Sequence, residues 1–167
     1  MLMFRNPFGA ISGEQMLEIG APVSGMLVNL ETVSDETFAQ AILGDGIAIV
    51  PEDGKFYAPE DGILVTMFPT GHAFSIETFS GVELLVHIGF DTVKLHGKYF
   101  TVFAKDGQKV KKGELLVEAD LDAISMVGFD ITTPMVVMNS DNFTNWKKAE
   151  GRIKAGETVL TLKKNGK

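Results

Sequence analysis

Histidine is the side chain of this sequence best suited to chemistry near neutral pH, and the chain has only three. His72 stands in PTGHAFSIET (69–78), and His87 stands 15 residues later in GVELLVHIGFDTVKLHG (81–97). Both segments have the apolar, alternating character of β-strands. His96 follows among lysines near a turn, where we expect a solvated side chain. Two imidazoles in apolar strands therefore require an explanation.

The strand that carries His87 has two unequal faces. Read with a period of two residues, the more apolar face holds Val82, Leu84, Val86 and Ile88. The opposite face holds Glu83, Leu85 and His87. This pattern alone favours a half-buried histidine with one hydrogen-bond partner and no further role.

The spacing of His72 and His87 argues for more. A turn at residues 80–81 separates the two extended segments, so they can form an antiparallel hairpin. That hairpin places residue 72 close to residue 87 or 88, and the two imidazoles on neighbouring positions. Because histidine is so scarce in this chain, two adjacent imidazoles indicate a functional site.

Two neighbouring imidazoles fit three kinds of chemistry. A catalytic zinc ion usually takes three protein ligands, and neither a third histidine nor a well-spaced carboxylate is evident. General acid–base catalysis needs a substrate pocket, which the sequence does not predict. In phosphoryl transfer, one neutral imidazole attacks phosphorus while the second holds the transferring oxygens by hydrogen bonds. The third chemistry needs little beyond positioning and a shallow apolar rim that excludes water.

Composition excludes several classes of protein. The chain has 167 residues, enough for one domain with a hydrophobic core, and 45% of them are hydrophobic. A net charge of −7 argues against a nucleic-acid partner. With no cysteine there is no disulfide, thiolate nucleophile or sulfur-ligated metal, which is compatible with the cytoplasm. We expect no signal peptide and no stable membrane insertion.

Regular turn signals predict an all-β fold. Glycine-rich turns recur about every 8 to 12 residues between short β-rich runs, which is typical of an antiparallel β-sandwich or barrel. Only 35–43 and 120–128 indicate short helical turns, each with an aspartate at its start. Residues 1–16 are predicted to be a flexible N-terminal arm, and 17–167 a single domain.

Two pairs of similar segments predict an internal duplication. APVSGMLVNL (21–30) and APEDGILVTM (58–67) share A-P-x-x-G followed by L-V in register. VKKGELL (110–116) and IKAGETV (153–159) share a β-branched residue followed by K-x-G-E. A duplicated β-motif, in which each half covers the apolar face of the other, explains both pairs.

The segments GDGIAI (44–49), 69–78 and 81–97 resemble the glucose-family enzyme IIA of the bacterial phosphoenolpyruvate-dependent sugar phosphotransferase system. The resemblance extends from about Leu17 to about Lys163. It implies an antiparallel β-sandwich built from a duplicated hybrid motif, and no cofactor or metal. It also implies a phosphotransferase component that receives a phosphoryl group from the histidine-containing phosphocarrier protein. The group then passes to the IIB domain of a glucose-type permease.

The resemblance also assigns residues. His87 would accept the phosphoryl group on Nε2, and His72 would support it. Thr70 would orient His72, and the Gly89 carbonyl would receive the Nδ1–H of His87. Partner docking would involve acidic and apolar positions: Asp35, Asp91, Phe38, Ile42, Phe68, Leu85 and Val93. The sequence departs from the family pattern in two places. Gly71 replaces a residue that is commonly polar, and the N-terminal arm does not match the amphipathic helix of enteric members.

Two other classes of protein share part of this pattern. A biotinyl- or lipoyl-carrier domain has similar turns but needs a lysine at a tight hairpin, and PMVVMN (134–139) has valines there. A zinc-dependent cell-wall peptidase would need an H-x-H pair with an upstream histidine and aspartate, and VHIG (86–89) supplies none.

Overall fold

Antiparallel strands dominate residues 15–166, the part of the chain that the computed structural model describes. The strands are β1 (Met16–Gly20), β2 (Gly25–Val28), β3 (Asp45–Pro51), β4 (Lys55–Tyr57), β5 (Gly62–Met67), β6 (Ala73–Thr78), β7 (Glu83–His87), β8 (Phe100–Val102), β9 (Lys109–Val110), β10 (Leu115–Ala119), β11 (Thr133–Val137), β12 (Phe143–Lys148), β13 (Arg152–Ile153) and β14 (Thr158–Lys164). The short helices are α1 (Glu36–Ala39), α2 (Leu121–Met126) and the 3₁₀ turns η1 (Leu30–Thr32), η2 (Thr92–Leu95) and η3 (Ser140–Asn142). The all-β prediction is confirmed. The predicted N-terminal arm lies outside the described residues up to position 14, and β1 begins at Met16.

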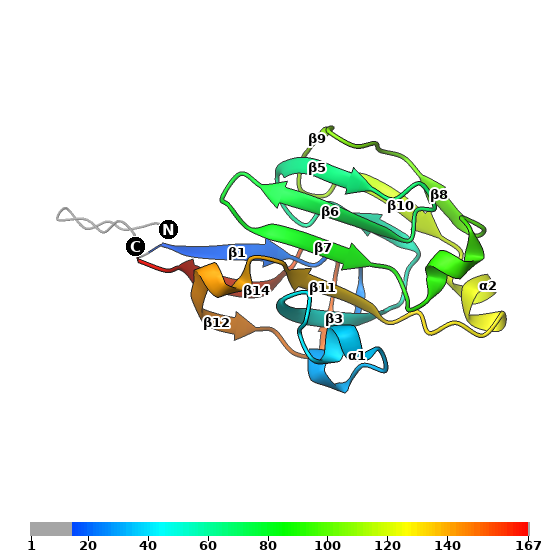
Figure 1. The fold of residues 1–167 in the computed structure, drawn as a ribbon, viewed down its shortest axis with the longest axis horizontal. Helices are drawn as coiled ribbons and strands as arrows, with labels where there is room; N and C mark the ends of the chain where they lie inside the picture. The colour runs from blue at the N-terminus through cyan, green and yellow to red at the C-terminus, as the bar shows by residue number, and fades with distance from the viewer. Residues whose placement is uncertain (1–14, 167) are drawn as a thin grey trace.

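The strands form three sheets. The largest has eight strands in the order β13-β2-β3-β11-β7-β6-β5-β9. Two three-stranded sheets, β1-β14-β12 and β4-β10-β8, complete the fold (Figure 1). The larger of two clusters of buried side chains in the described residues includes Phe56, Leu64, Phe74 and Leu160, which are almost fully excluded from solvent.

The predicted duplication is visible in the sheet order and in matched hydrogen bonds. Read from its two ends, the eight-stranded sheet gives β13-β2-β3-β11 and β9-β5-β6-β7, which are equivalent series. Ala21 N donates to Glu157 O at 2.8 Å, and Ala58 N donates to Glu114 O at 2.9 Å. The two A-P-x-x-G turns thus contact the two K-x-G-E turns in the same way.

The hairpin of β6 and β7 has the predicted register. Ala73 lies opposite His87, and Ile88 N donates to His72 O at 2.6 Å. The turn is closed by Gly81, which has a φ of +97° and donates its N–H to Thr78 O. The register puts the apolar side chains of β7 in the core and leaves Leu85 and His87 half-buried on the other face. Both histidines therefore stand at the same end of the hairpin.

The two repeats differ in how their outer faces are covered. Residues 29–44 connect β2 to β3 and include η1 and α1, whose Leu30 and Phe38 cover Ala48 and Val136. The equivalent connection, between β5 and β6, is only residues 68–72. The face of β6 and β7 that holds His87 therefore has no such connection from its own repeat, and Phe38 of α1 reaches it from the other repeat.

Helix α1 is shorter than the predicted 35–43. Asp35 caps it by accepting from Thr37 N at 2.9 Å and from Phe38 N at 3.4 Å. The helix ends at Ala39, and Ala41 has a φ of +56°, which an α-helix does not allow. Within residues 15–166 no helix is long and apolar enough to cross a membrane.

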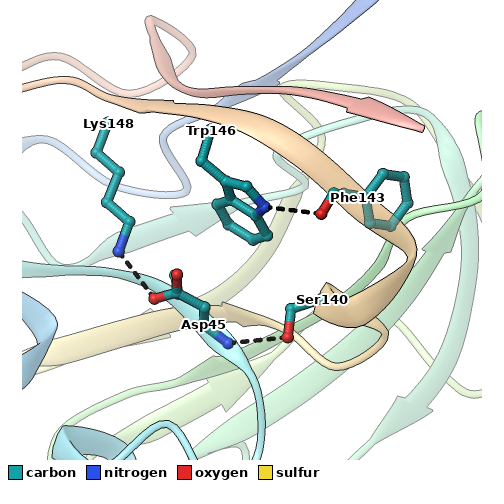
Figure 2. Close-up of polar contacts among 6 residues, drawn as sticks. Asp45, Ser140, Phe143, Trp146 and Lys148 are labelled. Atoms are coloured by element: carbon teal, nitrogen blue, oxygen red, sulfur yellow. Dashed lines mark hydrogen bonds and ion pairs between the residues drawn. The ribbon is translucent and has the colours of Figure 1, made fainter. Parts of the chain in front are cut away.

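Polar contacts connect β12 and the preceding turn η3 to strand β3 of the eight-stranded sheet. Lys148 Nζ lies 2.8 Å from Asp45 Oδ1, and Asp45 N donates to Ser140 Oγ at 3.3 Å (Figure 2). Trp146 Nε1 donates to Phe143 O at 3.2 Å on the inner side of the same strand. β12 carries a register shift between Thr144 and Lys147. This irregular strand is held by side chains as well as by its ladder.

Candidate functional site

The structure brings His72 and His87 together. Their ring centroids are 5.1 Å apart and their planes cross at 80°. Phe68 lies edge-on to His72 at 5.2 Å, and Phe38 lies tilted against His87 at 5.3 Å. The two imidazoles thus form the centre of a short aromatic row in which phenylalanine flanks each end.

The protonation of His87 is set by a backbone carbonyl. Its Nδ1 lies 2.6 Å from Gly89 O. A carbonyl oxygen only accepts, so Nδ1 of the neutral ring carries the proton and Nε2 keeps a free lone pair. The resemblance had pointed to this contact, and it leaves one nitrogen of His87 free to act as a nucleophile.

Gly89 can make this contact because it has no side chain. Its φ is +75°, and a Cβ there would lie 2.8 Å from both Asp130 O and Thr92 Cγ2. Phe90 N donates to Asp130 O at 2.9 Å, and Thr92 Oγ1 donates to Ile88 O at 2.6 Å. The sequence analysis did not identify Asp130 or Thr92 as supports of this turn. A glycine two residues after a strand histidine was the only signal.

His72 has a different partner. Its Nδ1 lies 2.6 Å from the hydroxyl oxygen Oγ1 of Thr70, which can either donate or accept. The side chain is almost fully buried, with 4% of its surface exposed. Its carbonyl oxygen accepts from Ile88 N, so backbone and side chain are both fixed. Thr70 and His72 therefore lie where the sequence placed them.

Burial keeps both imidazoles neutral. Desolvation, together with the smaller effect of the charge that His87 would carry, lowers the pKa of His72 to about 4. Desolvation also lowers the pKa of His87, but its hydrogen bond to Gly89 O and the charges of Asp35 and Asp91 oppose the shift. At neutral pH both rings are uncharged, as a nucleophile and its hydrogen-bonding neighbour require.

The apolar side chains of the predicted docking set differ in their exposure to solvent. Ile42, Val93 and Phe68 expose 66%, 49% and 37% of their surface, so they offer apolar area to a partner. Leu85 is half-buried beside Val136 in the sheet. Phe38 exposes only 4% and packs on His87 and Phe90, so it supports the imidazole from within.

Two carboxylates complete the predicted set. Asp35 is half-buried, and one oxygen already caps α1. Asp91 is exposed and has a φ of +62° at the start of η2. Both act electrostatically on His87, so both lie near it. Together they put negative charge on the border of an apolar surface.

Metal ligation was one of the other chemistries considered for this pair. In the described part of the chain, no group of three or more histidine, aspartate or glutamate side chains is arranged to hold a metal ion. The geometry supports a nucleophilic imidazole beside a second, hydrogen-bonding imidazole, with a phenylalanine against each ring and two carboxylates nearby. Those are the features of a site that exchanges a small group with another protein.

Comparisons with known proteins agree with this class of site. Residues 17–143 match the family model described as phosphoenolpyruvate-dependent sugar phosphotransferase system, EIIA 1. The PTS system glucose-specific EIIA component of Haemophilus influenzae is 43% identical over 98% of this chain and 100% of that protein. A PTS system beta-glucoside-specific EIIBCA component of Halalkalibacterium halodurans is 40% identical over 87% of this chain, which spans 23% of that relative.

A solved structure shows the same fold. Glucose permease IIA from Mycoplasma capricolum matches with a TM-score of 0.84 and 40% identity, covering 89% of this chain and 96% of that one. The chain therefore belongs to the EIIA 1 family of the sugar phosphotransferase system, and it is a phosphocarrier of that system. The comparisons support neither the biotinyl- or lipoyl-carrier alternative nor the peptidase alternative.

Proposed function

We propose that His87 is the phosphoacceptor of this phosphocarrier and takes the phosphoryl group on Nε2. The observation that carries the proposal is the contact of 2.6 Å between His87 Nδ1 and Gly89 O. Because that contact keeps the proton on Nδ1, the lone pair of Nε2 is free to attack phosphorus. His72 Nδ1 has no such carbonyl partner, so the two rings are not interchangeable.

The transfer conserves atoms and protons. The bond between nitrogen and phosphorus in the donor breaks as the bond between His87 Nε2 and phosphorus forms. The donor nitrogen regains its lone pair, and the Nδ1 proton stays on His87. The phosphorylated ring gains positive character, which Gly89 O, Asp35 and Asp91 stabilise.

His72 supports the transferring group in this proposal. Thr70 Oγ1 donates to His72 Nδ1, which places the ring proton on Nε2. That N–H then donates to an oxygen of the phosphoryl group while it moves between proteins. A neutral donor suits this task because it adds no charge that would hold the phosphoryl group too tightly.

The partners follow from the family and from the surface. The donor is the histidine-containing phosphocarrier protein, and the acceptor is the IIB domain of a glucose-type permease. Support for a IIB partner comes from the Halalkalibacterium halodurans relative, whose name joins EIIA with EIIB and EIIC components in one protein. Asp35 and Asp91 would attract a basic donor surface, and Ile42, Phe68 and Val93 would make the apolar contact. With these partners, we expect the chain to act in the cytoplasm.

Reconstitution tests the proposal. Incubation with phosphoenolpyruvate, enzyme I and the phosphocarrier protein should yield a protein with one added phosphoryl group. Addition of a glucose-type IIB domain should then remove that group. A chain that stays unmodified with a competent donor, or keeps its phosphate in the presence of IIB, would contradict the proposal.

A further inference from the structure

Strand β8 packs against the turn that precedes β6 and carries His72. The turn is closed by Gly71, whose N–H donates to Phe68 O at 2.7 Å and whose φ is +78°. A Cβ on Gly71 would lie 2.9 Å from Phe100 Cβ and 2.9 Å from Val102 Cγ2. The backbone of the turn and the side chains of β8 are therefore in direct contact, with no room for another atom.

This contact is next to the hydrogen bond that orients His72. Gly71 stands between Thr70 and His72, whose side chains are joined at 2.6 Å. A Cβ on Gly97 would lie 3.7 Å from Thr70 Cα, so the start of the same segment reaches the turn as well. Movement of the turn would change both the position of Thr70 and the plane of the His72 ring.

Strand β8, which makes this contact, is paired on one side with strand β10. β8 pairs with β10, with Phe100 opposite Ala119 and Val102 opposite Val117. On its other side β8 pairs with no strand of residues 15–166, because it is the edge of its three-stranded sheet. The buried strand β10 thus fixes β8, and β8 fixes the turn.

We propose that Val102 and Phe100 are positioning residues for His72, acting through Gly71. This rests on the proposed function of His72, because positioning matters only if that imidazole supports the transfer. Phe100 is half-buried and has a role in the core. Val102 exposes 36% of its surface, so its contact with Gly71 is the part that substitution can remove with little effect on folding.

The test compares three variants. Val102→Ala removes Cγ2 and frees the turn, whereas Val102→Thr keeps a branched side chain of nearly the same shape. Val50→Ala is the matched control, because Val50 exposes the same 36% on β3. Thermal unfolding of all three should show that each is folded.

Two measurements are made on each protein. One is the rate of phosphoryl uptake from the donor and of discharge to the IIB domain. The other is the ¹⁵N chemical shift of the His72 ring nitrogens as a function of pH. For Val102→Ala we expect discharge to slow by about tenfold, since small misplacement of a supporting group is costly. We also expect altered His72 shifts, with both effects absent in Val102→Thr and Val50→Ala.

The outcomes separate the two proposals. Wild-type discharge and wild-type His72 shifts in Val102→Ala would overturn the positioning role of β8. Slower discharge with unchanged His72 shifts would also overturn it, because the effect would then not pass through the imidazole. If the wild-type chain takes up no phosphoryl group, the proposed function fails. The His72 shifts alone then decide whether β8 positions that ring.

Discussion

The carbonyl oxygen of Gly89 lies 2.6 Å from Nδ1 of His87, whereas Nδ1 of His72 faces the hydroxyl of Thr70. A carbonyl fixes a proton on the nitrogen that it contacts, and a hydroxyl can supply one. Two imidazoles with ring centroids 5.1 Å apart thus have different partners at Nδ1, and we propose that they carry their protons on different nitrogens. The account of their different roles depends on this difference.

His72→Gln should separate uptake from discharge. The variant keeps the nucleophile His87 and should accept phosphate from the donor, but a flexible amide replaces the rigid ring that holds the supporting N–H in place. We expect discharge to the IIB domain to fall by about 100-fold, the size of effect seen when one transition-state donor is lost. Stopped-flow or quench-flow kinetics with purified IIB would measure it.

His96→Gln is the control, because His96 is exposed and is not part of the ring contact between His72 and His87. It should behave as the wild type. Normal discharge by His72→Gln would remove His72 from the site.

The buried imidazoles should make stability depend on pH. The pKa of His72 falls from 6.5 to about 4 on folding, first through burial and then through the charge of His87. Between these values the unfolded chain binds a proton that the folded chain does not. The free energy of unfolding should therefore decrease as pH falls from 6.5 to 4, by about 3 kcal/mol for His72.

Urea unfolding at several pH values would measure this change. Other groups also titrate, so the informative quantity is the difference between the wild type and His72→Gln. The variant should lose less stability on acidification. Equal losses in the two proteins would show that His72 is not buried as a neutral ring.

Gly89→Ala should damage both fold and site. The new Cβ would meet Asp130 O and Thr92 Cγ2 at 2.8 Å, at a φ of +75°. We expect a loss of about 3 kcal/mol, because the clash adds to the cost of a left-handed alanine. The hydrogen bond to His87 Nδ1 should be weakened as well, which slows phosphoryl uptake.

Gly113→Ala provides the comparison. Gly113 has a φ of +89° with nothing within 4 Å of the added Cβ, so only the backbone cost of about 1 kcal/mol applies. Chemical denaturation would measure both variants. A Gly89→Ala protein no less stable than Gly113→Ala would argue against the close packing of this turn.

Asp91→Asn should slow uptake of the phosphoryl group, chiefly because the donor is attracted less strongly to the site. Asparagine tolerates the φ of +62° at this position, so the backbone is preserved while one negative charge is lost. We expect uptake to slow by about threefold at low ionic strength, and the difference from wild type to shrink in 1 M salt. Uptake rates at several salt concentrations give the measurement.

Glu118→Gln removes an exposed charge on β10, in a different sheet, and should have little effect. If the two variants slow uptake equally, overall charge rather than the border of the site attracts the donor.

The histidine pair could be predicted from sequence because a hairpin has a fixed register. Once a turn was assigned to residues 80–81, the antiparallel pairing of the two strands placed His72 next to residues 87 and 88. The duplication was also predictable, because its two repeated turns keep the same residues. Both features depend on short-range patterns.

Other features depend on contacts that no local pattern records. Strands β4 (Lys55–Tyr57) and β12 (Phe143–Lys148) were not predicted, since one is very short and the other is polar and interrupted by a register shift. The support of Gly89 by Asp130 comes from a segment about 40 residues away, as a carbonyl rather than a side chain. Such contacts follow from the folded arrangement.

The central claim is that His87 Nε2 carries the phosphoryl group, and the position of the phosphate tests it most directly. We would label the histidine rings with ¹⁵N, phosphorylate the chain through enzyme I and the phosphocarrier protein, and look for coupling between ³¹P and a ring nitrogen. We predict coupling to Nε2 of His87 and no phosphorylation of His87→Ala. Coupling to Nδ1, or phosphate on His72, would contradict the account.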